Sequence, residues 1–71
     1  MADRLTKLTV NLVARAVAAL DDVALLTGDT KTDSVNRAIQ VYAFLEREQR
    51  TRGKRIFLID DDNKMERVQL L

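Results

Sequence analysis

"KLTVNL", residues 7–12, decides the fold that this sequence predicts. Apolar and polar residues alternate along the stretch, in the order Lys7, Leu8, Thr9, Val10, Asn11 and Leu12. Side chains of a β-strand point to opposite faces with a period of two, so the alternation predicts a strand with one apolar and one polar face. The polar face offers a cation, a hydroxyl and an amide, which are groups suited to hydrogen bonding.

A strand at residues 7–12 needs a partner, because its backbone donors and acceptors would otherwise stay unpaired. Two segments could pair with it: a C-terminal hairpin of the same chain, or the same strand of a second copy. A twofold axis would set two copies antiparallel, with the apolar faces on the helices and the polar faces outside. Such a two-stranded ribbon fits the major groove of DNA, where cations, hydroxyls and amides contact base edges.

Two helices are predicted after this stretch. The first covers residues 13–27, where apolar residues recur at spacings of three and four on one face: Val13, Val17, Leu20 and Ala24. Gly28 is expected to end it, because glycine adopts the left-handed C-cap conformation at low cost. The second runs from about residue 31 to about residue 50, with Thr30 as its N-cap. Asp33 lies in its first turn, where a negative side chain is stabilised by the partial positive charge of the helix N-terminus.

The second helix is apolar on more than one side. Its expected inner face consists of Val35, Ala38, Ile39, Tyr42 and Leu45. Val41 and Phe44 form a further apolar stripe. A helix buried so widely in a chain of 71 residues indicates contact with another subunit.

A C-terminal β-hairpin is predicted after Gly53. Residues 54–59 are rich in β-branched and aromatic residues, "DDDNK" at 60–64 is typical of a turn, and residues 65–71 alternate again. The acidic turn lacks the spaced ligands and the glycine of a calcium loop. We therefore divide the chain into a domain at residues 1–52 and a hairpin extension at residues 53–71.

Composition narrows the function classes. The chain has no cysteine and no histidine, and its net charge is only +1. Catalytic residues, a metal site and a cofactor are therefore not expected, and the protein is not predicted to be an enzyme. No apolar run approaches the roughly 20 residues of a membrane span, and a signal peptide is not recognisable. We expect a cytoplasmic protein, and so small a core favours oligomerisation.

In this order, "KLTVNL", an amphipathic helix and "TGDTKTDSVNRAI" at the start of a second helix resemble the ribbon-helix-helix family of the MetJ, Arc and CopG type. The resemblance covers roughly residues 5–47. It implies a mainly α-helical, intertwined homodimer with a short N-terminal strand, here followed by the hairpin. It also implies that the paired strands enter the major groove, with Lys7, Thr9 and Asn11 contacting bases.

The resemblance further implies a phosphate site at the start of the second helix, at Thr30, Lys31 and Thr32. A helix N-terminus has free N–H groups and a partial positive charge, which gives this site an independent physical basis. Arg4 is a candidate backbone-contacting arm, and "RTRGKR", residues 50–55, is either a solvated helix end or a phosphate-contacting patch. The expected dimer core consists of Leu8, Val10, Leu12, Val35, Ile39 and Tyr42.

These features together predict a sequence-specific transcriptional repressor that binds double-stranded DNA as a homodimer or as several dimers on adjacent half-sites. An antitoxin, or a plasmid or phage partition or copy-control protein, is an alternative with the same fold. In that case residues 53–71 could bind a protein partner. A protein-interaction module without DNA binding is the alternative of another class.

Overall fold

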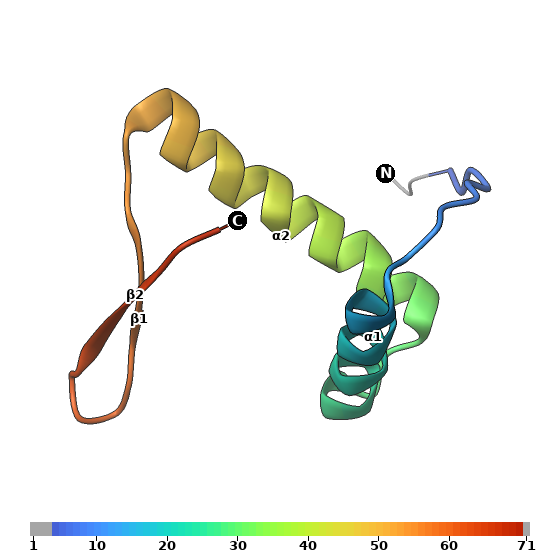
Figure 1. The fold of residues 1–71 in the computed structure, drawn as a ribbon, viewed down its shortest axis with the longest axis horizontal. Coiled ribbons are helices and arrows are strands. Elements are labelled where there is room, and N and C mark those ends of the chain that lie inside the picture. Colours follow the sequence, from blue (N-terminus) through green and yellow to red (C-terminus); the bar gives the residue numbers. More distant parts are fainter. Residues whose placement is uncertain (1–3, 71) are drawn as a thin grey trace. The chain divides into compact units, whose positions relative to one another are not determined.

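The computed structural model describes residues 4–70 of the chain. Its elements follow in the order α1 (Ala14–Thr27), α2 (Lys31–Arg52), β1 (Ile56–Ile59) and β2 (Met65–Val68) (Figure 1). The chain divides into two compact units, one ending at Ser34 and one beginning at Val35. The first unit contains α1 and the first turn of α2, and the second contains the rest of α2 and the hairpin.

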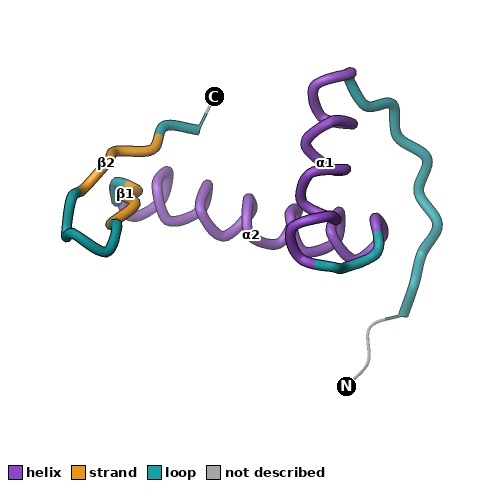
Figure 2. Tube along the Cα trace, turned by 90° about the horizontal axis from the view of Figure 1, so that it is seen from below, coloured by secondary structure: helices purple, strands orange, loops and turns teal. Residues whose placement is uncertain are grey.

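The predicted N-terminal strand is wrong. Residues 4–13 form neither helix nor strand and run as a loop into α1 (Figure 2). The strand-helix-helix order of the ribbon-helix-helix fold is therefore not found, since both strands follow the helices. The alternation at residues 7–12 distinguishes an apolar from a polar face, but a strand also needs a neighbouring strand to bond its backbone, and the alternation does not provide one. In residues 4–70 the strands β1 and β2 pair with each other, so the hairpin does not serve as that partner.

Helix α1 confirms the expected helix and its predicted end at Gly28. Its N-terminus lacks a side-chain cap. The Val13 side chain makes no capping hydrogen bond, and the amides of Ala16 and Val17 both donate to the Val13 carbonyl, at 2.9 and 3.1 Å. Gly28 has φ +77°, and its N–H donates to the Ala24 carbonyl at 2.9 Å. That left-handed residue ends the helix as predicted, because it satisfies a terminal carbonyl without a Cβ clash.

Helix α2 confirms the predicted N-cap and extends past the predicted end. Thr30 Oγ1 accepts the Asp33 N–H at 3.1 Å, which satisfies one of the free donors of the first turn. The helix continues to Arg52 and stops at Gly53, which has φ +64° and donates its N–H to the Gln49 carbonyl at 3.1 Å. The same left-handed glycine cap thus ends both helices.

The C-terminal hairpin is confirmed. β1 and β2 are antiparallel, with Ile56 opposite Val68 and Ile59 opposite Met65. Asp60 organises the turn, because its Oδ1 accepts the N–H groups of Asp62 and Lys64, both at 2.9 Å. An aspartate that bonds backbone amides just ahead of it is a common way of fixing a turn.

Burial of apolar side chains is incomplete everywhere in the described part of the chain. Within residues 4–70 no hydrophobic side chain is buried, and Leu25 and Leu26 of α1 are 85% and 84% exposed. Neither described helix is long and apolar enough to cross a membrane. Each large aliphatic side chain moved out of water contributes about 1.5–3 kcal/mol, so the exposed apolar faces favour association with another polypeptide.

We expect the thermal stability of the protein to depend on its concentration. A chain that buries its apolar faces only on association gains stability by mass action. The midpoint of thermal unfolding, followed by circular dichroism, should rise when the protein concentration is raised a hundredfold. A midpoint that stays constant over that range would show that a single chain is stable by itself.

Ser34 in α2 is the exception to the general exposure. It is 3% exposed, and its Oγ has no hydrogen-bond partner in the described chain. A buried hydroxyl without a partner costs about 1–3 kcal/mol relative to a satisfied one. Because the site is buried, it needs a small side chain. The hydroxyl itself adds nothing to the stability of the isolated chain, because it has no partner there.

Ser34→Ala should leave the free energy of unfolding unchanged or raise it by about 1 kcal/mol, because alanine removes the unpartnered hydroxyl and favours helix. Ser34→Leu should lower it by about 1–3 kcal/mol through overpacking. Urea denaturation of the two variants and the parent at one protein concentration measures both effects. A destabilised Ser34→Ala protein would mean that the hydroxyl is bonded in the assembled state.

Candidate nucleic-acid interface

The segment before α1 presents the side chains that were predicted to contact bases. Lys7, Thr9 and Asn11 are all exposed, and within residues 4–70 none of them has a hydrogen bond or an ion pair. Arg4, the predicted arm residue, is exposed as well. A cation, a hydroxyl and an amide on one non-helical segment are therefore available to an external ligand.

The apolar members of the same segment are also exposed in the single chain. Leu8 is 80% exposed, Val10 65% and Leu12 47%. The predicted dimer core on α2 is no better covered: Val35 is half-buried, while Ile39 and Tyr42 are exposed. The assignment of these residues to a dimer core stays a prediction, since it concerns contacts with a second copy.

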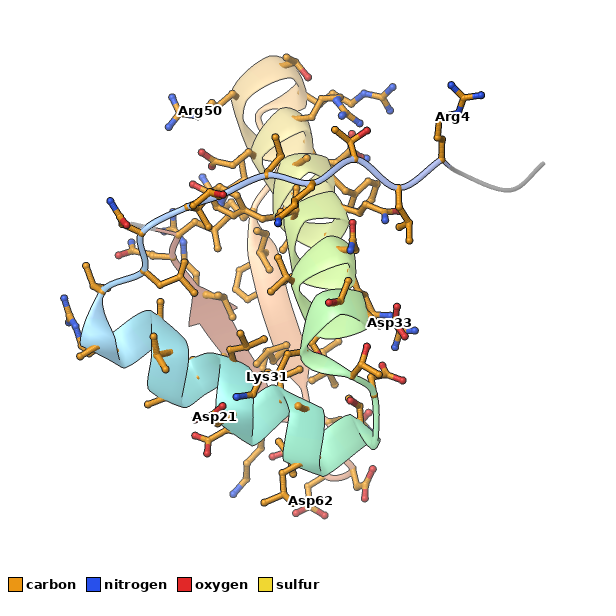
Figure 3. All side chains as sticks on the ribbon, turned by 90° about the vertical axis from the view of Figure 1, so that its right-hand side faces the viewer. Arg4, Asp21, Lys31, Asp33, Arg50 and Asp62 are labelled. Atoms are coloured by element: carbon orange, nitrogen blue, oxygen red, sulfur yellow. The ribbon has the colours of Figure 1, made fainter. Side chains whose placement is uncertain are left out.

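The start of α2 is less cationic than the sequence suggested. Lys31 reaches across to α1, where its Nζ lies 3.1 Å from Asp21 Oδ1 (Figure 3). Thr30 uses its Oγ1 as the N-cap, and Thr32 is exposed beside it. Exposed ion pairs are weak, about 0–1 kcal/mol, so a phosphate could displace Asp21 from Lys31. The helix end still has its partial positive charge.

The basic cluster at residues 47–55 is largely paired within its own part of the chain. Arg50 lies 3.2 Å from Glu46, Arg52 lies 3.3 Å from Glu48, and Lys54 lies 2.6 Å from Glu48. Of the cluster, Arg47 and Arg55 make no ion pair with any described residue. These pairs support a solvated helix end over a phosphate-contacting patch, and they leave two cations for external contacts.

Sequence reasoning did not anticipate the carboxylates that pair with these cations. Glu46 and Glu48 precede Arg50 and Arg52 by four residues, a spacing that places side chains side by side on a helix and could have been recognised. Asp21 carried no such indication, because its contact with Lys31 depends on the turn between the helices. Tyr42 adds a hydrogen bond from its hydroxyl to Glu46 Oε2 at 3.3 Å.

The two units carry different parts of the candidate interface. The segment with Lys7, Thr9 and Asn11 and the start of α2 belong to the first unit, and the basic cluster belongs to the second. No set of three or more acidic side chains in the described chain is arranged to hold a metal ion. The described residues of the candidate interface present hydrogen-bond donors, acceptors and cations at the surface.

Comparison with known proteins adds no family to this description. No protein-family model matches the chain, and no curated protein sequence or solved structure matches it either. The candidate interface therefore rests on the residues of this chain alone.

Proposed function

We propose that this protein is a self-associating DNA-binding regulator that represses transcription by occupying a site on double-stranded DNA. The observation that carries the proposal is the exposure of Lys7, Thr9 and Asn11 without partners in the described chain. Lysine ammonium groups bond guanine, asparagine amides bond adenine, and hydroxyls bond either base in the major groove.

The spacing of the three residues suits a row of base pairs. An extended chain advances about 3.3–3.6 Å per residue, so alternate side chains lie roughly 7 Å apart. Base pairs in DNA follow one another at about 3.4 Å, so two steps span nearly the same distance. Extended along a groove, this segment would place Lys7, Thr9 and Asn11 at every second base pair.

Contacts to phosphates would hold the protein in place while the segment contacts bases. Arg4, Arg47 and Arg55 are among the cations that make no ion pair with any described residue, and they lie before or after the segment in the chain. The helix end at Thr30, Lys31 and Thr32 adds backbone donors to this set. The net charge of +1 limits non-specific affinity, and association of two copies would double each contact.

We expect Lys7→Ala and Asn11→Ala to relax the sequence preference of DNA binding, and each substitution should weaken binding to the preferred site by about 1–3 kcal/mol. The preferred site is first enriched from a random duplex library with the parent protein, and affinities are then measured at several salt concentrations. Lys64→Ala, which removes the same charge from the hairpin turn, is the matched control and should leave the preference unchanged.

A further variant tests the helix end. Asp21→Asn removes the partner of Lys31 and should tighten binding and steepen the salt dependence, because one more cation becomes available to phosphate. The proposal fails if the parent enriches no sequence, or if Lys7→Ala and Asn11→Ala bind the enriched site with the selectivity of the parent.

A protein-interaction module is the second candidate, favoured by the apolar exposure of both helices and the hairpin. An antitoxin would combine this role with DNA binding. Purification of the full chain from its own cells distinguishes these cases. A stoichiometric protein partner without DNA enrichment favours the interaction module, and a partner together with an enriched site favours the antitoxin.

A further inference from the structure

The outer edge of β1 is unprotected against pairing with another strand. Its four residues, Ile56–Ile59, include no charge and no proline, and Leu58 and Ile59 are 60% and 62% exposed. Edge strands of stable proteins normally carry a charge, a proline or a bulge that blocks further pairing. A two-stranded hairpin is also marginal by itself, which favours the addition of strands.

The hydrogen-bond phase of the hairpin shows which backbone groups face this edge. The Asp60 N–H donates to the Lys64 carbonyl at 3.0 Å, so these two residues occupy a hydrogen-bonded position of the ladder, with the Lys64 N–H bonded to Asp60 Oδ1 in place of its carbonyl. Hydrogen-bonded and non-bonded pairs alternate along an antiparallel ladder, which makes Leu58 and Glu66 the next bonded pair. Phe57 and Ile59 therefore direct their N–H and C=O groups to the free edge.

The charges flanking β1 have opposite signs at its two ends. Lys54 and Arg55 precede the strand, and Asp60, Asp61 and Asp62 follow it. If β1 of a second copy lay antiparallel to it, the cationic end of each strand would lie beside the acidic end of the other. Such a dimer would contain two of these favourable contacts. A parallel copy would set like charges together, which is unfavourable. The segment 54–62 is thus complementary to itself in one direction only.

We propose that β1 pairs antiparallel with β1 of a second copy of this chain, across a twofold axis perpendicular to the sheet, to give a four-stranded sheet. The two registers that centre the axis on β1, and so pair most of its residues, have either Phe57 or Leu58 facing its own counterpart. In the second register Arg55 lies directly opposite Asp61 of the other copy. Neither residue has an ion pair with any described residue, whereas Lys54 is held by Glu48.

The outer edge of β2 does not offer the same contact. Glu66 and Arg67 occupy the middle of that strand. A twofold axis at either position would set two carboxylates or two guanidinium groups directly opposite each other, and like charges so placed are destabilising. Self-pairing is therefore directed to β1. This contact does not depend on DNA binding and is testable without DNA.

Charge reversal of the full chain tests the contact by sedimentation without DNA. Arg55→Glu and Asp61→Lys should each weaken self-association about tenfold or more, because residues 55 and 61 of the two copies then repel each other, as directly opposed neighbours in the second register and as diagonal neighbours in the first. An equimolar mixture of these two variants, and the double variant R55E/D61K, should recover it. Arg67→Glu on β2 is the matched control and should associate like the parent.

Disulfide trapping tests the register, since the chain has no cysteine of its own. Under mild oxidation Phe57→Cys or Leu58→Cys should form a covalent dimer, depending on which residue lies at the axis. Glu66→Cys should not, because the two β2 strands would lie about 14 Å apart, three strand spacings, beyond the roughly 7 Å reach of a disulfide.

Three results would overturn the proposal. The first is association of both single reversals with the affinity of the parent. The second is failure of the mixture to recover the association that each single variant lacks. The third is crosslinking of Glu66→Cys in preference to both β1 variants.

Discussion

Covering apolar surface is the constraint on which the remaining structure depends. The helices and the hairpin are well defined locally, by glycine caps, a threonine cap and an aspartate turn, yet residues 4–70 enclose no buried apolar side chain. Local capping fixes where an element begins and ends, but each cap contributes only about 1 kcal/mol. Covering the exposed apolar faces with another polypeptide would add about 1.5–3 kcal/mol for each large aliphatic side chain moved out of water. In the proposed assembly, self-association and ligand binding are linked, because the same associated state would support both.

The sequence predicts the local features well. Gly28, Thr30, Gly53 and the turn at Asp60 each act where their backbone chemistry indicates, and they place both helices and the hairpin within a few residues. Residues 7–12 show the limit of this reasoning. Their alternation predicts two faces, but a strand forms only when its backbone bonds a neighbouring strand. The alternating pattern does not indicate which segment that neighbour is. The ion pair between Lys31 and Asp21 was missed for a similar reason, since it depends on the path of the chain between two helices.

Charge is distributed differently at the end of α2, before α1 and along the hairpin. The cations at the end of α2 are mostly paired with Glu46 and Glu48, whereas Lys7 makes no pair within the described chain. This separation accounts for a low net charge alongside local cationic sites. In the hairpin, basic residues precede the apolar strand β1 and acidic residues follow it. This order makes antiparallel and parallel pairing of two copies electrostatically different, which would not hold for an uncharged apolar strand. A segment of this kind favours one direction of self-pairing over the other.

The Asp60 turn has a consequence for the order of events during synthesis. Its hydrogen bonds join residues at most four positions apart, and the two helices are equally local. Helices form in about 0.1–1 μs and hairpins in about 1–10 μs, whereas assembly of subunits takes milliseconds or longer and slows on dilution. In the proposed assembly, a newly made chain acquires its secondary structure long before it meets another copy. That bimolecular encounter would then be the slow step of maturation, and the rate of expression would set how long each chain waits with its apolar side chains in water.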